Sequence, residues 1–388
     1  MNLWETAEAF REEVREFLDR ELPPQARFDH EFTEDEELWA LGYEFTRKVA
    51  QRGWIGLTWP KEYGGLGRSF ADRLVLAEEI GRREAPLINN IGWGLAAGSL
   101  LAGGTHEQKL RFLPPIAKME TFWAEGLSEP DAGSDLAGLS TTASRRGDEW
   151  VINGQKTYTT WGTRADVLYL AARTDPDAPR HRGISIFCLD VHTPGVTLTP
   201  MWNIAGGRQN HTYLDDVRVP ADMLIGEEGR GWDFIMRAFY ESGPTVATYT
   251  VIERQLAHVV EYCRTTTRHG RKLIDDPVVR QQIAEIALAA QAERLLAWER
   301  VADAVHGRPP AFGGAIGAVV NKEHRARVAQ VVSEIVGPLG FLTGHHDDRL
   351  PFGGELPDWF LRSFGNHAGG TSQVKRMVLA TRGLGLPR

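Results

Sequence analysis

The stretches Trp123 to Asp135, WAEGLSEPDAGSD, and Asn153 to Thr160, NGQKTYTT, are the most informative parts of this chain. Small residues such as Gly133 and Ser134 let the backbone approach a bound molecule closely. The hydroxyls of Ser128 and Ser134, together with main-chain N–H groups, suit a pyrophosphate or the edge of a heterocycle. The same composition also fits an ordinary surface loop, so both interpretations stay open at this point.

The residues around these stretches show β-strand patterns. Trp150 to Lys156 predicts a hairpin, because Asn153-Gly154 tolerates the positive φ angles of a tight turn. Three more β-rich runs follow, at 167–172, 183–189 and 212–219, and segments rich in Asp, Pro and Gly separate them. The middle of the chain, residues 121–230, is therefore predicted to be a small β domain.

Upstream of this domain the pattern is helical. Apolar residues recur at helical spacing in three segments, 10–17, 38–49 and 74–80. Thr105 and Gln108 form a capping box for a fourth helix, which is predicted to end at Phe112 before Pro114-Pro115. Residues 1–120 are therefore predicted to form a helical domain.

The last part of the chain returns to long helical patterns. Asp276-Pro277 provides an N-cap and a first-turn proline for a helix that reaches Val305 and that Gly307 ends. Two further helices are predicted at 316–339 and 371–380. Long amphipathic helices joined by short links predict a bundle over residues 231–388, and their extra apolar faces indicate burial against another subunit.

Composition limits the classes of function. The 388 residues are 42% hydrophobic, enough for a large core, and the 44 basic and 52 acidic residues form no block that indicates a nucleic-acid surface. Cys188 and Cys263 are too few for a disulfide framework. The N-terminus lacks the apolar core of a signal peptide, and no segment reaches membrane-spanning length. We expect a cytoplasmic protein with neither a nucleic-acid nor a membrane partner.

Other motifs carry no chemistry. The run His345-His346-Asp347-Asp348 has no metal-ligand spacing, so we expect a solvated loop and no metal site. The segment 64–67, GGLG, neither follows a strand nor opens a βαβ unit, which argues against a dinucleotide-binding fold. Cys188 lies in an apolar strand pattern and is expected to pack in the core.

The order of helices, β domain and helical bundle, with both stretches in the β domain, resembles the acyl-CoA dehydrogenase family over essentially the whole chain. Three further segments are similar to that family and occur in its order, 53–65, 215–220 and 369–376. The resemblance implies an α+β fold with an N-terminal helical domain, a middle β domain that holds flavin and a C-terminal four-helix bundle. Segments 181–190 and 206–220 are most similar to the branch that acts on bulky, branched or steroid-like acyl groups.

This resemblance implies FAD as the cofactor and an acyl-CoA thioester as the substrate. In the family a carboxylate removes an α-proton, the β-hydrogen leaves as hydride to flavin N5, and electrons pass to an electron-transfer flavoprotein. Tyr158 occupies a place that Trp often holds, so the stacking area is reduced but retained. The positions that match the family's flavin contacts are Leu127, Ser128, Gly133, Ser134, Tyr158, Thr160, Gly370 and Thr371.

The catalytic base departs from the commonest family pattern. Many members place a Glu directly before Gly-Thr in the C-terminal segment, and this chain has Gly369 there. A second family pattern places the base early on the first long helix of the C-terminal domain, and Glu241 matches it. The resemblance therefore implies Glu241 as the base, with the Gly369 backbone N–H as a donor to the thioester carbonyl. A helical Glu on a solvated face is the alternative for Glu241, and Gly243-Pro244 is expected to interrupt that helix.

A second departure concerns assembly. The family segment that grips the adenylate half of a neighbouring subunit's FAD is replaced by Thr266 to Gly270, where Arg268 is the candidate substitute. Two alternatives for assembly follow. The chain forms a homotetramer or homodimer, or it is a half-site or non-catalytic subunit of a heteromer with a homologous chain. A separate alternative for the reaction is that the fold serves as a flavin monooxygenase or nitroalkane oxidase.

Overall fold

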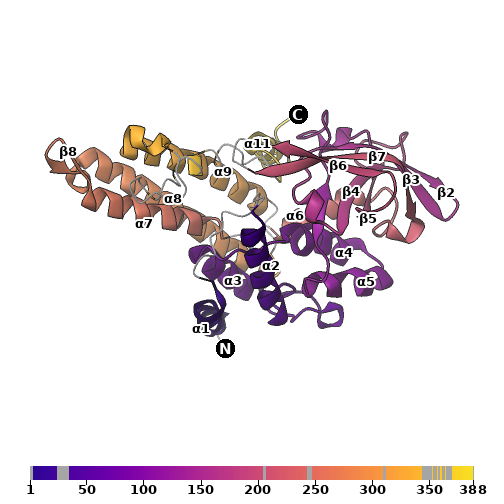
Figure 1. Ribbon diagram of the computed structural model, residues 1–388, viewed down its shortest axis with the longest axis horizontal. Helices are drawn as coiled ribbons and strands as arrows, with labels where there is room; N and C mark the ends of the chain where they lie inside the picture. The colour runs from indigo at the N-terminus through magenta and orange to yellow at the C-terminus, as the bar shows by residue number, and fades with distance from the viewer. Residues whose placement is uncertain are drawn as a thin grey trace. The chain divides into compact units, whose positions relative to one another are not determined.

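The computed structural model describes residues 3–23, 35–203, 207–242, 247–308, 312–342 and 369–387, with positions 352, 356, 359, 360 and 363. Contacts divide the chain into two units, residues 12–73 with 84–243, and residues 1–11 with 74–83 and 244–388. Figure 1 labels the elements along the chain from α1 to α11. The three-domain division at residues 120 and 230 stays a prediction beside this division by contacts.

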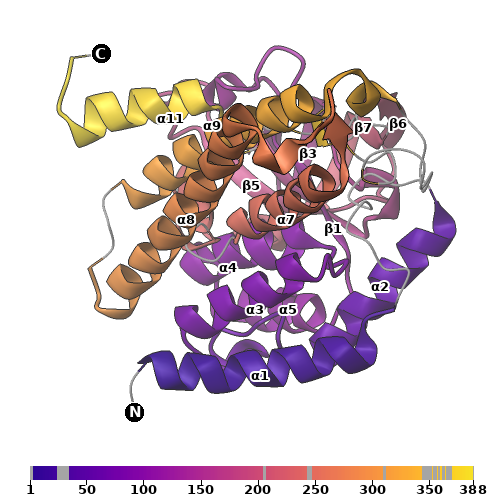
Figure 2. The same cartoon turned by 90° about the vertical axis from the view of Figure 1, so that its left-hand side faces the viewer.

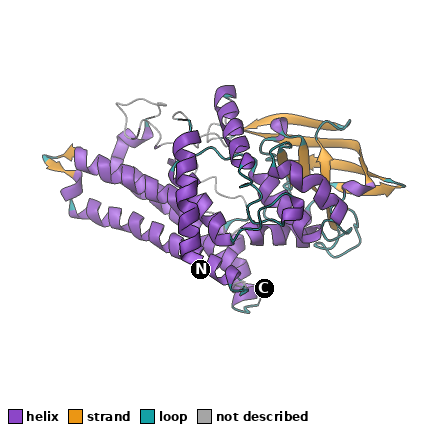
Figure 3. Cartoon of the chain, turned by 90° about the horizontal axis from the view of Figure 1, so that it is seen from below, coloured by secondary structure: helices purple, strands orange, loops and turns teal. Residues whose placement is uncertain are grey.

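Among the described residues, the unit of 12–73 and 84–243 contains a seven-stranded sheet, drawn in orange in Figure 3. Its strand order is β1-β4-β2-β3-β7-β6, with β5 paired antiparallel to β4. β1 runs parallel to β4, whereas β3 and β7 are antiparallel. The strands are β1 Trp123–Gly126, β2 Thr142–Arg146, β3 Glu149–Lys156, β4 Val167–Arg173, β5 Ile184–Asp190, β6 Val196–Trp202 and β7 Arg208–Pro220.

The hairpin predicted within 150–156 is wrong. Asn153-Gly154 lies inside β3. The tight turn lies earlier in the chain, between the end of β2 and the start of β3, where Gly147 has a φ of +64°. Gly154 has a φ of +151°, and a Cβ added there would stand 2.5 Å from Thr141 Oγ1. The glycine is therefore required for close approach of backbone and not for a turn.

A β-bulge interrupts the pairing of β3 with β7. The register shifts at Asn153, so that Asp215 and Asp216 of β7 both lie opposite it, and Asp216 has a φ of +47°. The Asn153 amide donates to Asp216 Oδ1 at 3.0 Å, and Asp216 N donates back to Asn153 Oδ1 at 2.8 Å. Buried side chains consequently occupy even positions up to Leu214 and odd positions from Val217 onward.

Helices surround this sheet within the same unit. The capping box is confirmed, since Thr105 Oγ1 accepts from Gln108 N at 3.2 Å and the Gln108 side chain accepts from Thr105 N. That helix passes its predicted end at Phe112, because the carbonyls of Pro114 and Pro115 still accept bonds from later amides. The helices are α2 Glu36–Gln51, α4 Ala97–Gly103, α5 His106–Ala117 and α6 Gly231–Ser242, with a π-helical turn at Ile91–Ala96.

α6 is held closely by its neighbours. It packs beside β5 (Figure 1) and against α4, where a Cβ on Gly98 would lie 3.0 Å from the Cα of Ala238. The hydroxyl of Ser99, in α4, lies 2.7 Å from the hydroxyl of the fully buried Tyr169. A Cβ on Gly103 of α4 would also stand 2.1 Å from the ring of Phe234 in α6, so the two helices pack closely and the position of α6 is tightly determined.

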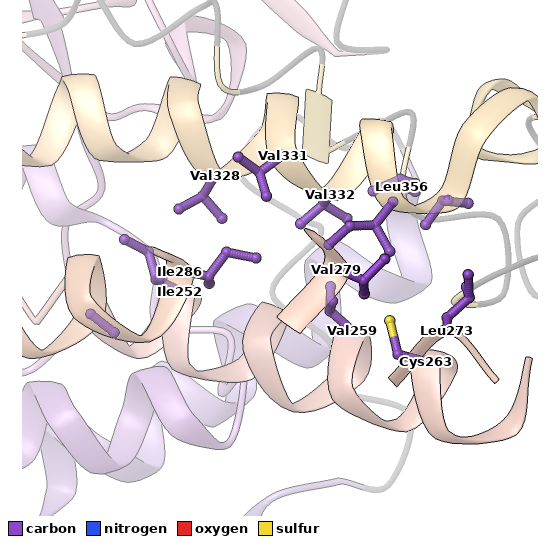
Figure 4. Packing of buried hydrophobic residues seen from close by; sticks show 13 residues of the cluster. Ile252, Val259, Cys263, Leu273, Val279, Ile286, Val328, Val331, Val332 and Leu356 are labelled. Atoms are coloured by element: carbon purple, nitrogen blue, oxygen red, sulfur yellow. The ribbon is translucent and has the colours of Figure 1, made fainter. Parts of the chain in front are cut away.

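The other unit is a helical bundle. Figure 2 shows α7 Tyr249–Thr265, α8 Pro277–Val305 and α9 Gly313–Val336 running side by side, and α11 Ser372–Val378 packs on α9. The ends of α8 are confirmed, since Asp276 Oδ1 caps Val278 N at 2.8 Å and Gly307 has a φ of +66°. The core between these helices is shown in Figure 4 and includes Ile252, Val259, Cys263, Leu273, Val279, Ile286, Val328, Val331 and Val332.

Two helices cross between the units along the chain, α1 Leu3–Glu21 and α3 Phe70–Arg82, and a short ribbon pairs β8 Thr267–Arg268 with β9 Arg271–Lys272. In the part of the chain that the structure covers, no helix has the combined length and apolarity needed to span a bilayer.

Candidate active site

The two stretches that stood out in the sequence meet in the β unit. Thr157 N donates to Ser128 O at 2.9 Å, which joins the end of β3 to the loop after β1. Lys156 Nζ lies 2.7 Å from Glu129 Oε1 and donates to the carbonyl of Leu127 at 3.2 Å. The structure therefore brings together two stretches that 17 residues, 136–152, separate in the sequence.

The contact between Glu129 and Lys156 is a buried ion pair, with side chains 3% and 0% exposed. Ser140 donates to Glu129 through its backbone N and its hydroxyl, and Thr141 N donates as well. Burial raises the pKa of Glu129, but the charge of Lys156 and these hydrogen bonds outweigh it and lower the pKa to about 2. Burial lowers the pKa of Lys156 to about 8, against the attraction of Glu129. The pair is therefore charged at neutral pH.

This pair was not predicted from the sequence, although both residues lie inside the quoted stretches. A lone Glu and a lone Lys in loops are solvated in most proteins. The available signal was only the opposite sign of the two stretches: the first contains Glu125, Glu129, Asp131 and Asp135, the second contains Lys156 alone, and nothing singled out Glu129 as its partner. Nothing in local spacing indicated that these two charges would meet.

The loop after Glu129 is tight and open on one side. Glu129 and Ala132 exchange two backbone hydrogen bonds, at 3.0 and 3.1 Å, which turns the chain sharply. Gly133 and Ser134 follow this turn and are exposed, and a Cβ on Gly133 would meet no atom within 4 Å. Leu127 is buried and Ser128 half-buried. The loop thus presents small residues and backbone to an open surface, as a pyrophosphate requires.

The second stretch presents an aromatic ring. Tyr158 is 56% exposed and adopts a φ of +59°, which is uncommon for a residue other than glycine. Thr160 is half-buried, and its hydroxyl accepts from Gln209 Nε2 at 2.9 Å. The ring of Tyr158 is free to stack on a planar ligand.

The predicted residues of the C-terminal segment belong to the helical unit. Gly369 and Gly370 have φ angles of +70° and +92°, and a Cβ on Gly369 would meet no atom of the described residues within 4 Å. Thr371 is the N-cap of α11, and its Oγ1 accepts from Val374 N at 3.2 Å. Among the described residues, nothing fills the position that a side chain at Gly369 would take.

Glu241 belongs to the last turn of α6, but its side chain lies outside the described part of the structure, as does the segment 243–246. Arg268 donates from Nη2 to the carbonyls of Ile335 at 2.8 Å and Val336 at 3.3 Å, at the end of α9. These bonds fix the Arg268 guanidinium beside Gly337. A contact of Arg268 with a cofactor stays a prediction.

The residues set aside in the sequence can also be placed in part. Within the described ranges, no group of three His, Cys, Asp or Glu side chains is arranged to hold a metal ion, and 345–348 lie outside those ranges. Cys188 is buried in β5, where burial raises the pKa of its thiol, so it is a packing residue without a reactive thiolate.

Comparison with known proteins identifies the family. Residues 4–120 match the acyl-CoA dehydrogenase N-terminal domain, residues 124–217 the middle domain and residues 229–384 the C-terminal domain. The chain belongs to the acyl-CoA dehydrogenase family. It is an oxidoreductase of the class that dehydrogenates acyl-CoA thioesters, and members of this family are flavoproteins.

Three relatives are similar over nearly their whole lengths. The acyl-CoA dehydrogenase FadE26 of Mycobacterium tuberculosis is 33% identical over 402 residues, covering 98% of this chain and 97% of that protein. A chain of the ChsE4-ChsE5 complex of the same organism is 32% identical, covers 99% of this chain and 98% of its own, and superposes with a TM-score of 0.88. A chain of the Tcur3481-Tcur3483 steroid ACAD is 30% identical over all of both chains, also with a TM-score of 0.88.

Proposed function

We propose that this chain binds FAD and dehydrogenates the acyl group of an acyl-CoA thioester between its α and β carbons. The observation that carries the proposal is the joining of the two stretches by the buried Glu129–Lys156 pair. This pair holds an open loop of small residues and the exposed ring of Tyr158 on one β unit. An open loop suits a pyrophosphate and an exposed ring suits a flavin, so the residues present fit FAD.

FAD, when bound, supplies the hydride acceptor. The main chain at Leu127 and the hydroxyl of Ser128 would hold the edge of the ring system, and Gly133 and Ser134 would hold the pyrophosphate. On the other side of the ring, Tyr158 would stack and Thr160 would offer its hydroxyl. In the helical unit, Gly370 and Thr371 are proposed as further cofactor contacts, and Arg268 as the contact to a neighbouring subunit's cofactor.

Glu241 is proposed to remove the α-proton of the substrate, and the N–H of Gly369 to donate to the thioester carbonyl as enolate charge develops. Glu241→Gln should lower turnover by roughly 10²- to 10⁴-fold while FAD stays bound, which is the usual contribution of a general base. Glu261→Gln, on the exposed side of α7, is the control. Intact turnover in Glu241→Gln would rule out this assignment.

The acyl group is proposed to be bulky, branched or steroid-like, and the electron acceptor to be an electron-transfer flavoprotein. Similarity to a steroid ACAD supports the bulky substrate. The first experiment is the visible spectrum of the purified chain, with flavin released and counted per subunit. Bleaching by a series of acyl-CoA esters, from linear to steroid side chains, then identifies the substrate, and a lack of bleaching by every ester would contradict the proposal.

A second candidate is that the chain is one subunit of a mixed enzyme. Two observations favour it: the ChsE4-ChsE5 and Tcur3481-Tcur3483 structures each name two proteins, and Thr266 to Gly270 departs from the family's adenylate segment. Flavin that appears only on co-expression with a homologous chain would support a heteromer. Full FAD in the chain purified alone would support a homotetramer or homodimer. The cytoplasmic location stays a prediction.

A further inference from the structure

The first residues of β7 lie beside the end of the second stretch. Gln209 to Thr212, four consecutive residues of β7, bond to Thr157 to Thr160, four consecutive residues that follow β3. Regular pairing between β3 and β7 reaches only Lys156 and Thr212. The contacts beyond that point therefore involve side chains as well as backbone, and they form an additional structure, which we call the β7 clamp (Gln209, Asn210, His211 and Thr212).

Thr159 is held most completely. Its N donates to Asn210 O at 2.9 Å, and its carbonyl accepts from both Asn210 N and Asn210 Nδ2 at 3.1 Å. Its hydroxyl lies 2.9 Å from the hydroxyl of Thr212. All three side chains are 1% exposed or less. A residue bonded through backbone and side chain in a buried place has no alternative conformation at low cost.

Thr157, two residues earlier, is held by a different partner. Its Oγ1 lies 3.1 Å from His211 Nδ1 and 3.8 Å from the sulfur of Met201, and its N donates to Ser128 O. If the hydroxyl donates to sulfur, His211 Nδ1–H is the donor to the hydroxyl. Thr157 is only 5% exposed, so loss of His211 would leave a buried hydroxyl with the weak sulfur acceptor alone.

The residue between these two anchors is the one under strain. Tyr158 has a φ of +59°, and Gln209 Nε2 reaches its carbonyl at 3.4 Å as well as the Thr160 hydroxyl at 2.9 Å. A non-glycine residue in this region persists only where its surroundings determine its conformation, and such residues gather at functional sites. The ring of Tyr158 contributes little to the core, since it is 56% exposed. The uncommon backbone conformation of Tyr158 therefore does not serve to bury its ring within this unit.

We infer that His211 is a positioning residue of the flavin site, which acts through Thr157 to hold Tyr158 in the orientation that receives a planar ring. This inference rests on the proposed function, because the planar ligand is the flavin. The clamp fixes Thr157 and Thr159 on either side of Tyr158, so ligand binding meets a ring that is already oriented. Such preorganisation improves affinity by removing the entropy cost of ordering the ring at binding.

The test measures FAD affinity of the flavin-depleted chain, and the visible circular dichroism of bound flavin, in His211→Leu, Thr157→Val and the double variant. Each single variant should weaken FAD binding about tenfold, roughly the contribution of one buried hydrogen bond, and alter the dichroism. The double variant should be no weaker than either single one, because both remove the same contact. His211→Gln, which keeps a donor, should recover most of the affinity. His192→Leu, at an exposed histidine, is the control.

Unchanged FAD affinity and dichroism in His211→Leu, or strictly additive effects in the double variant, would overturn the inference. Hydrogen exchange of the amides at 157–160 in the flavin-free chain gives a readout that needs no cofactor. His211→Leu should speed that exchange, and unchanged exchange would overturn the clamp even if the wild-type chain binds no FAD. Absence of FAD from the wild type, both alone and co-expressed with a homologous chain, with a clamp that responds to His211 would instead contradict the proposed function.

Discussion

The carboxylate of Glu129 lies 2.7 Å from the ammonium nitrogen of Lys156, and the two residues are 27 positions apart in the sequence. Because both side chains are buried, neither charge has water as an alternative partner. The loop after β1 and the end of β3 are consequently coupled, and substitutions in the two segments should have non-additive effects on stability.

Removing one member of this pair should be costly. Lys156→Met leaves the Glu129 carboxylate buried without a cation, and we expect a loss of about 3–5 kcal/mol in the free energy of unfolding. The double variant with Glu129→Gln should recover part of that loss. Urea denaturation measures both. Arg218→Met, which breaks the exposed pair with Glu149, is the control, and equal effects of the two Met variants would contradict the prediction.

Glu129 should also make stability depend on pH. Its pKa is about 2 in the folded chain against 4.5 for the free side chain. Since the pKa in the folded chain is the lower one, the stabilisation that the charged Glu129 contributes is complete above pH 4.5 and is lost as the pH falls toward 2. The free energy of unfolding, measured between pH 6 and pH 3, should therefore fall more steeply as the pH decreases. The slope should be shallower in Glu129→Gln, and an identical slope in both proteins would contradict the assignment.

Tyr158 should matter for the cofactor more than for the fold. Since the ring is 56% exposed, Tyr158→Ala should leave the melting temperature of the flavin-free chain nearly unchanged. FAD affinity should fall by about 3- to 10-fold with the loss of stacking, and Tyr158→Trp should raise it above that of the wild type. Titration of flavin fluorescence checks both, and equal affinities in Ala and Trp variants would exclude a stacking role.

Gly369 tests the location of the base. Gly369→Ala should cost about 1–2 kcal/mol of stability, because its φ of +70° disfavours a Cβ although no atom of the described residues stands within 4 Å. In Glu241→Gln, the added change Gly369→Glu should restore some turnover of linear acyl-CoA esters. Initial rates with short and long linear substrates provide the measurement. Lower rates than Glu241→Gln alone would mean that substrate occupies this space.

The cap of α8 gives a prediction about the helical unit. Asp276→Ala should lower the free energy of unfolding by about 1 kcal/mol, because it removes the acceptor of Val278 N. Asp275→Ala, next to it and outside the helix, should have a smaller effect in the same denaturation experiment. A larger effect at Asp275 would show that the capping bond is not the source of the stabilisation.

Some local sequence signals proved accurate, but a local signature failed where a distant partner decided the structure. Asp276 and Gly307 act on their own helix, so both ends of α8 were predictable. Asn153-Gly154 has the local signature of a turn. Gly154 instead has a positive φ because Thr141, which directly precedes a neighbouring strand, leaves no room for a Cβ there. Acyl-CoA dehydrogenase membership followed from motif order and is confirmed. Segments that met only through folding, such as the end of β3 and the loop after β1, gave no pairing signal.

The two aspartates at 215 and 216 have a consequence for how this strand can vary. Side chains switch phase there, so residues up to Leu214 and residues from Val217 obey opposite odd and even rules. Deleting Asp216 would remove the bulge and leave one residue of β7 opposite Asn153, so that buried and exposed positions would alternate without interruption along the strand. In a relative without this extra residue, an alignment gap placed elsewhere in β7 would assign the intervening residues to the wrong face of the sheet. Asp215 and Asp216 are therefore the place in β7 where one residue can be gained or lost while the other side chains keep their faces.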